Sequence, residues 1–177
     1  AVQPEEPGSF MKPASCMFPP GGIIHLPPVT VANDVDAEGE LGVIIGRQCK
    51  GVSLADVPNV IFGYTTTLDL TALDVLARNP RYLTRAKSMD DFFSFGPVIV
   101  TADEIPDPHN LAIQCRVNGI TKQAATTAQM IFKIPAIIEI LSRGMTLEAG
   151  DIIATGTPSG VGFARIPPEF LQPGDVV

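Results

Sequence analysis

The alternation of polar and apolar side chains is clearest between Asp36 and Gly46, where an acidic start runs into an apolar body. This pattern predicts a β-strand whose second half is buried in the core. Because successive side chains of a strand point to opposite faces, Glu38 and Glu40 share one face and Gly39 points to the other. Two neighbouring carboxylates repel each other and resist burial unless a proton or a cation intervenes. The pair indicates either an exposed, solubilising strand start or a metal site.

A second strand is predicted from Val60 to Leu70, a stretch rich in β-branched and aromatic residues. The pattern then changes to a short helix over 71–77, which Asn79-Pro80 ends. Asp69 lies at this junction between strand and helix. It either caps the helix or adds a third carboxylate at a strand end, and the sequence leaves both interpretations open.

The second half of the chain predicts a hairpin and a helix. Alternation over 111–117, followed by Asn118-Gly119, is typical of a β-hairpin with a return strand at 120–124. Apolar residues at helical spacing predict a helix from Ile134 to Arg143 with its apolar side in the core.

The sequence Leu-x-x-Gly-Asp occurs at 147–151 and again at 171–175. Each copy predicts a turn that leads into a strand. The chain stops as the second of these strands begins, so we expect a native C-terminal portion to be missing. A short strand is also expected at 98–100, and a loop containing Lys87 at 82–95.

The elements predict a mainly β fold with short helices, in the α+β class. Prolines throughout residues 1–32 exclude a long helix or a central strand there. We therefore expect an irregular N-terminal segment, with at most short edge strands near 9–12 and 23–26, that leads into one domain at 33–177.

Composition narrows the class of protein. The 177 residues are 45% hydrophobic and 18% charged, which is typical of a globular domain. A net charge of −7 and a pI near 4.7 argue against a nucleic-acid partner. No run of about 18 apolar residues predicts a membrane span, and we expect a cytoplasmic protein without a signal peptide.

Cysteine and histidine are too few and too scattered for a zinc site. The three cysteines and two histidines form no Cys-x-x-Cys pair, and unpaired cysteines favour a reducing compartment. A bound metal would therefore have oxygen ligands, which Mg²⁺, Mn²⁺ and Ca²⁺ prefer.

A glycine-rich loop follows the apolar run near 152. Residues 155–162 read Thr-Gly-Thr-Pro-Ser-Gly-Val-Gly, which is not a phosphate-binding Walker sequence. Its amides and hydroxyls could hold a carboxylate or carbonyl oxygen, or the loop could be only a tight turn.

Many short motifs, in this order and spacing, resemble the fumarylacetoacetate hydrolase family in its fumarylacetoacetase C-terminal domain. The resemblance runs from about Phe10 to the end of the chain. The motifs include Lys12-Pro13, Glu38-Gly39-Glu40-Leu41, Gly63-Tyr64-Thr65, Leu68-Asp69, Lys87-Ser88, Val117-Asn118-Gly119, Met130-Ile131 and the 155–162 loop.

The resemblance implies a mixed β-sandwich or β-roll fold, a homodimer, and a Mg²⁺ or Mn²⁺ ion held by three carboxylates. In this sequence those are Glu38, Glu40 and Asp69, with Lys87 as the catalytic residue. Thr157 and Gly156, in the loop, would bind an oxo-acid substrate. The metal would stabilise an enolate as a Lewis acid.

The chain departs from the family pattern in two places. Family hydrolases carry a His and a Glu on an upstream lid, and nothing here matches them, so we expect the lid to be missing from this chain. Many acylpyruvate-type members also have Arg and Gln where this chain has Leu73 and Leu76. These leucines predict an apolar wall for a bulkier or less charged substrate.

Four functions follow as hypotheses. The first is metal-dependent hydrolysis of a C–C bond in acylpyruvate or β-diketone substrates. The alternatives are an oxaloacetate-type decarboxylase or keto–enol tautomerase, a biosynthetic enzyme with a repurposed fold, and a non-enzymatic dimer.

Overall fold

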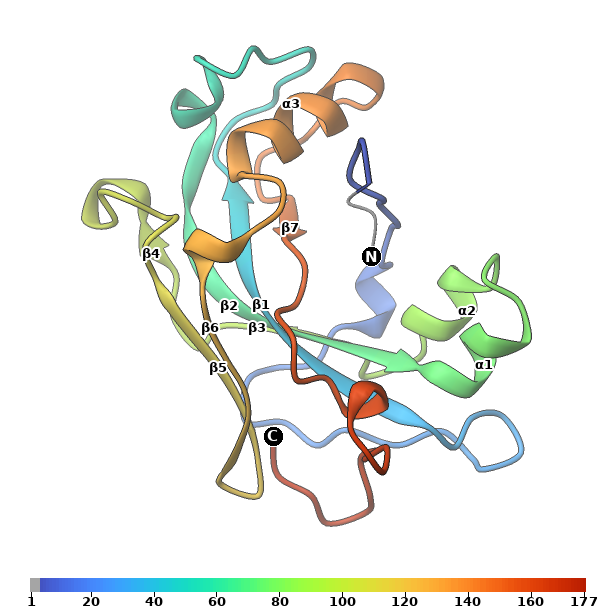
Figure 1. Ribbon diagram of the computed structural model, residues 1–177. Coiled ribbons are helices and arrows are strands. Elements are labelled where there is room, and N and C mark those ends of the chain that lie inside the picture. Colours follow the sequence, from blue (N-terminus) through green and yellow to red (C-terminus); the bar gives the residue numbers. More distant parts are fainter. Residues whose placement is uncertain (1–3) are drawn as a thin grey trace.

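The computed structural model describes residues 4–177, and its centre is a long antiparallel pair of strands, β1 (Val35–Ile45) and β2 (Ile61–Ala72) (Figure 1). β7 (Ile152–Ala154) pairs with the other edge of β1, while β3 (Phe93–Phe95) and β4 (Val100–Thr101) pair with different parts of β2. The two long strands predicted from the sequence are confirmed.

The predicted hairpin is also confirmed, as a separate two-stranded sheet of β5 (Ala112–Val117) and β6 (Ile120–Thr126). Its turn has positive φ at Asn118 and Gly119 (52° and 75°), as the Asn-Gly sequence favours. A Cβ atom built on Gly39 of β1 would lie 3.0 Å from the Cβ atom of Cys115. Glycine at this position therefore lets the hairpin pack closely against β1.

The helices are short and lie at the ends of the main sheet. α1 (Leu73–Arg78) and α2 (Leu83–Lys87) follow the end of β2, and α3 (Ile134–Gly144) lies at the opposite end (Figure 1). Single 3₁₀ turns occupy Ala14–Cys16, Val57–Asn59, Ala102–Glu104, Thr127–Gln129 and Gly162–Ala164. Among residues 4–177, none of the helices has the length and apolar character needed to cross a bilayer.

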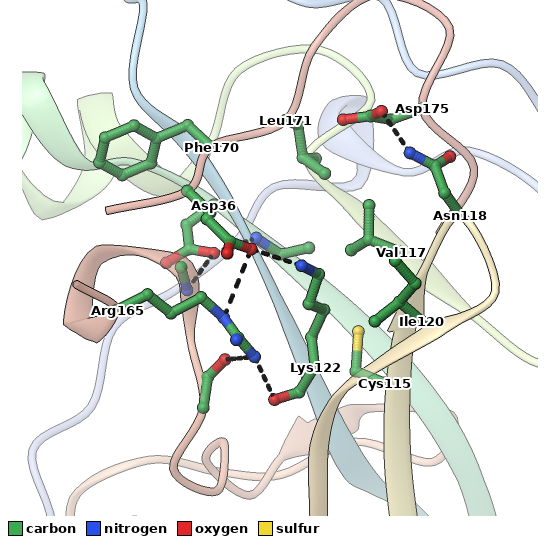
Figure 2. Close-up of a pocket in the computed structure, with 14 residues that line it drawn as sticks. Asp36, Cys115, Val117, Asn118, Ile120, Lys122, Arg165, Phe170, Leu171 and Asp175 are labelled. Carbon is green, nitrogen blue, oxygen red and sulfur yellow. Dashed lines mark hydrogen bonds and ion pairs between the residues drawn. The ribbon is translucent and has the colours of Figure 1, made fainter. Parts of the chain in front are cut away.

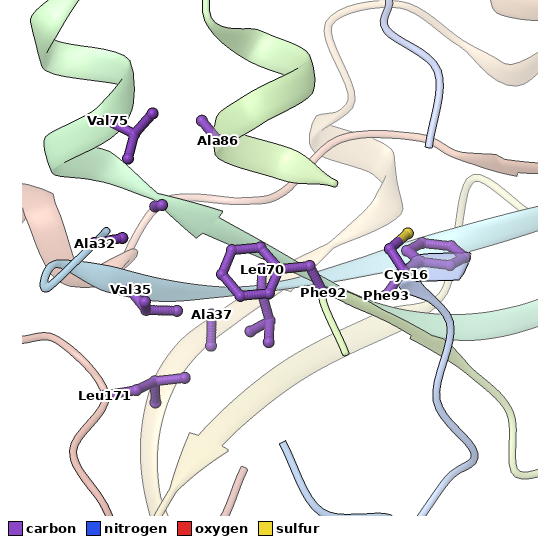
Figure 3. Close-up of a cluster of buried hydrophobic side chains, with 11 residues drawn as sticks. Cys16, Ala32, Val35, Ala37, Leu70, Val75, Ala86, Phe92, Phe93 and Leu171 are labelled. Carbon is purple, nitrogen blue, oxygen red and sulfur yellow. The ribbon is translucent and has the colours of Figure 1, made fainter. Parts of the chain in front are cut away.

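Alternate side chains of β1 divide the molecule into an apolar and a polar face. Val35, Ala37, Leu41, Val43 and Ile45 belong to two buried apolar clusters. The first cluster surrounds Leu70 and Phe92 (Figure 3), and the second includes the α3 residues Ile134 and Ile138, as their helical spacing predicted. The acidic side chains at 36, 38 and 40 point to the other face, as the period of two requires.

Several sequence predictions of local structure are wrong. The segment 82–95 is not a loop, because α2 docks on β2 and β3 pairs with it. The strand predicted at 98–100 is found at Val100–Thr101 instead, as β4. The short edge strands expected near 9–12 and 23–26 do not form.

The repeated turn is confirmed, but only its first copy leads into a strand. Asp151 and Asp175 each accept a backbone N–H three residues earlier, at 2.8 Å in both copies. Residues after Asp175 instead bond to the β5–β6 turn, where the Asn118 N–H donates to the Val176 carbonyl.

Candidate metal centre

Three carboxylates meet on the polar face of the β1–β2 pair. Glu38 and Glu40 lie two residues apart on β1, and Asp69 stands directly opposite Glu38 on β2. Each residue offers one oxygen atom, and the three oxygens lie within 4.8 Å of one another. Glu40 and Asp69 are buried, at 4% and 1% exposed. Asp69 does not cap the following helix, because β2 continues to Ala72 and α1 has no side-chain cap.

Two ammonium groups neutralise part of this negative charge. Lys87, the last residue of α2, donates to Glu38 Oε2 at 2.9 Å and to Asp69 Oδ2 at 2.8 Å. Lys12 donates to Asp69 Oδ1 at 2.6 Å and also to the Lys87 backbone carbonyl. The structure thus places Lys87 beside two of the three carboxylates, and its catalytic role stays a prediction. The sequence does not predict the contact of Lys12 with Asp69, because a lysine in a proline-rich irregular segment is usually a solvated surface charge. The only indication in the sequence is that Lys12 belongs to the Lys12-Pro13 family motif.

The environment changes the protonation of two of these groups. Burial, together with the negative charge of Asp69, raises the pKa of Glu40 to about 8, although the hydrogen bond from Gly156 opposes the shift. Burial by itself would lower the pKa of Lys87, but Asp69 and Glu38 outweigh it and raise that pKa. In the metal-free protein Lys87 is therefore protonated at neutral pH and neutralises part of the charge of the two carboxylates.

The donor set fits a hard divalent cation. Mg²⁺ and Ca²⁺ take oxygen ligands at about 2.0 to 2.6 Å, so oxygens that share one ion lie within roughly 4 to 5 Å of one another. A carboxylate has about four lone-pair sites. Glu38 and Asp69 each accept two hydrogen bonds and Glu40 accepts one, so all three keep acceptor capacity for an ion.

The glycine-rich loop 155–162 runs along β1 from the point where β7 ends. Its hydrogen bonds reach consecutive residues of β1: the Thr155 N–H donates to Leu41 O (3.0 Å), the Gly156 N–H to Glu40 Oε2 (2.7 Å), and the Thr157 hydroxyl to Gly39 O (3.1 Å). These bonds bring Gly156 and Thr157, both predicted as substrate ligands, beside the carboxylates. The loop therefore does more than turn the chain.

Leu73 and Leu76 lie half-buried on α1, which follows directly from the strand that carries Asp69. Leu76 packs against the apolar cluster around Phe92. A contact of these leucines with substrate stays a prediction.

A separate cavity of about 160 Å³ lies at the start of β1, beside Asp36 (Figure 2). Its charged groups bond to one another: Lys122 pairs with Glu169, and Arg165 donates to the Lys122 and Gly160 carbonyls. Asp36 itself accepts the N–H groups of Gly162 and Phe163, both at 2.9 Å. The hydrogen bonds around this cavity hold the far end of the 155–162 loop, and none of the clustered carboxylates lines it.

Comparison with known sequences places this arrangement in a family. The family model described as fumarylacetoacetate (FAA) hydrolase C-terminal matches residues 1–177. Oxaloacetate tautomerase YisK of Bacillus subtilis is 44% identical over 174 residues, which are 98% of this chain and 57% of that protein. The mitochondrial oxaloacetate tautomerase fahd2 of Xenopus laevis is 43% identical over 175 residues, 98% of this chain and 54% of that protein. The chain thus spans little more than half the length of these relatives.

Solved structures agree with this assignment. The 5-carboxymethyl-2-hydroxymuconate delta-isomerase of Mycobacterium smegmatis superimposes with a TM-score of 0.87 at 38% identity, over 99% of this chain and 64% of that chain. The fumarylacetoacetate hydrolase of Exiguobacterium antarcticum gives a TM-score of 0.84 at 39% identity, over 95% of this chain and 61% of that chain. The resemblance and the mainly β fold predicted from the sequence are confirmed, and the chain belongs to the fumarylacetoacetate hydrolase family.

Proposed function

We propose that the protein is a divalent-metal-dependent tautomerase that interconverts the keto and enol forms of oxaloacetate or a similar small oxo-acid. The observation that carries the proposal is the cluster of Glu38, Glu40 and Asp69, whose oxygens lie within 4.8 Å of one another. The ammonium group of Lys87 is bonded to two of these carboxylates. The two tautomerase relatives, 44% and 43% identical to this chain, support the substrate class.

Keto–enol interconversion moves a proton between a carbon and the neighbouring carbonyl oxygen, and the enolate between the two forms needs its charge stabilised. A bound Mg²⁺ or Mn²⁺, held by the three carboxylates, would supply a Lewis acid for the oxygens of the oxo-acid. Lys87, bonded to Glu38 and Asp69, would add positive charge beside the developing oxyanion. Gly156 and Thr157 would bind the polar part of the substrate, and we expect Leu73 and Leu76 to contact its apolar part.

Hydrolysis of a C–C bond is the second candidate, since one structural relative is described as a fumarylacetoacetate hydrolase. This reaction additionally needs a group that activates water. His25 bonds to Asp91 at 2.6 Å, and His109 Nε2 accepts the Ile134 N–H at 3.1 Å. Both histidines of this chain thus bond outside the carboxylate cluster, so hydrolysis would need a water-activating group from elsewhere, and the order of the two candidates rests on the tautomerase relatives.

The test is the interconversion of oxaloacetate enol and keto forms, followed by ultraviolet absorbance with the full-length protein. We expect Mg²⁺ to activate the reaction, EDTA to abolish it, and Lys87→Met to lower kcat. A parallel assay of pyruvate release from acylpyruvates tests hydrolysis. Pyruvate release from acylpyruvates without tautomerisation of oxaloacetate would contradict the proposed tautomerase function and support C–C hydrolysis.

Homodimerisation and a cytoplasmic location stay predictions. The cysteines Cys16, Cys49 and Cys115 are free, which suits a reducing compartment. The Xenopus relative, by contrast, is described as mitochondrial.

A further inference from the structure

Gln123, on β6, is a buried polar side chain that the proposed chemistry does not use. It is 2% exposed, and its amide makes three hydrogen bonds. Its Oε1 accepts the Gly39 N–H at 2.9 Å, and its Nε2 donates to Thr157 Oγ1 at 2.7 Å and to Pro158 O at 2.8 Å. One side chain thus connects the hairpin, the strand between the two clustered glutamates, and the glycine-rich loop.

The hydrogen bonds of Gln123 and Thr157 take the place of a neighbouring strand at the edge of β1 near Gly39. β7 pairs with β1 only from Gly42 to Ile44, so the Gly39 peptide lies beyond the paired region of this edge. Gln123 accepts its N–H, and the Thr157 hydroxyl donates to its carbonyl. Because a buried peptide group without a partner costs about 1 to 3 kcal/mol, both side chains add to the stability here, while pairing with β2 sets the position of this part of β1.

The same contacts fix the hydroxyl of Thr157. This group gives its single proton to the Gly39 carbonyl and accepts a hydrogen bond from Gln123 Nε2. A hydroxyl has one donor and two acceptor sites, so only one acceptor site remains. The hydroxyl is therefore used to hold the loop on β1, and an oxo-acid oxygen, which needs a donor, would be bound by backbone N–H groups of the loop instead.

We infer that Gln123 is a positioning residue. Through Thr157 and Pro158 it holds the 155–162 loop in register with β1, so that the backbone N–H groups of the loop can bind the oxo-acid, and it sets the affinity for the oxo-acid without setting the affinity for the metal. The carboxylates of Glu38 and Glu40 point to the opposite face of β1 and make no hydrogen bond to Gln123. This inference rests on the proposed oxo-acid site.

The test compares Gln123→Met with wild type, since methionine keeps the length of the side chain and removes its amide. Calorimetry with Mg²⁺ should give an affinity within about twofold of wild type, because no carboxylate changes. With Mg²⁺ present, the affinity for oxalate, a stable oxo-acid mimic, should fall about tenfold. Hydrogen exchange of the 155–160 amides, which needs no ligand, should become faster.

Two further variants make the comparison specific. Thr157→Val should also weaken oxalate binding, and the double variant should be no weaker than Thr157→Val alone, because the two residues act as a unit. Gln114→Met, at an exposed glutamine on β5 of the same hairpin, is the matched control and should leave every measurement unchanged.

The inference would be overturned if Gln123→Met had the oxalate affinity and the loop hydrogen-exchange rates of wild type. It would also be overturned if Gln123→Met lost as much affinity for Mg²⁺ as for oxalate, because that result indicates general disruption of the site. If Gln123→Met does not fold, Gln123→Glu carries the same test, since it keeps the acceptor for Gly39 but lacks the donor to Thr157. A wild-type protein that binds Mg²⁺ and oxalate but does not tautomerise oxaloacetate would contradict the proposed function and leave the role of Gln123 standing.

Discussion

Glu40 should make the stability of the metal-free protein fall as the pH rises. Its pKa is about 8 in the folded protein against 4.5 for the ordinary group, mainly because it is buried. The folded protein therefore holds this proton more tightly than the unfolded chain does. Stabilisation from such a group is complete below about pH 4.5 and is lost as the pH rises through about 8.

The size of the effect follows from the two pKa values. Proton linkage gives a loss of about 4 kcal/mol in unfolding free energy between pH 5 and pH 9, of which about 1 kcal/mol falls between pH 7 and pH 9. The pKa of His109 is lowered by burial from 6.5, so its opposite contribution ends near that value. Burial also raises the pKa of Cys16, Cys49 and Cys115 above 9.0, so these thiols lower stability near pH 9 as well, and the difference between wild type and a Glu40 variant isolates Glu40.

The assay is urea unfolding in EDTA at pH 7 and pH 9. Glu40→Gln keeps the size of the side chain and an acceptor for the Gly156 N–H, but it cannot titrate. Wild type should lose about 1 kcal/mol more than Glu40→Gln over this interval. Glu148→Gln, at an exposed carboxylate, should behave as wild type. An equal loss in wild type and Glu40→Gln would refute the reasoning.

Further predictions concern the lysines and a glycine. Lys87→Met should destabilise the metal-free protein by about 3 kcal/mol or more, since it leaves two carboxylates without their shared counter-charge. Lys12→Met should cost less in the same urea titration, because Lys87 still neutralises the carboxylate that both contact; a larger loss for Lys12→Met would contradict this order. Gly162→Ala should cost about 2 kcal/mol or more, because its Cβ atom would overlap the Glu169 carbonyl. Gly144→Ala, with nothing within 4 Å of the added atom, should be neutral or slightly stabilising in thermal melts, and equal melting temperatures for the two glycine variants would show the packing argument to be wrong.

The sequence predicts those elements whose local pattern is strong. β1 and β2 have long β-type runs, the hairpin has its Asn-Gly turn, and α3 has a complete apolar stripe. α2 and β3 have no such pattern in the segment 82–95. They form because Phe92 and Phe93 are buried in the core and Lys87 is bonded to the β1–β2 carboxylates, which are tertiary contacts that no local pattern records.

The site residues also divide into those that the local sequence pattern predicts and those that only tertiary contacts bring together. Alternation along one strand predicts that Glu38 and Glu40 lie side by side. Asp69 joins them only because β1 and β2 pair in the register that sets it opposite Glu38, and a single sequence does not specify that register. Lys12 and Gln123 come from segments far away in the chain, so their roles emerge only from the folded structure.

The central claim, that three carboxylates share one divalent cation, is tested most directly by calorimetric titration of the metal-free protein with Mg²⁺. Asp69→Asn keeps the shape of the side chain and removes one charge, and Asp103→Asn, at an exposed position, is the control. We expect wild type and Asp103→Asn to bind one Mg²⁺ per chain and Asp69→Asn to lose this binding. Mg²⁺ binding by Asp69→Asn with wild-type affinity, or no binding by wild type, would contradict the claim.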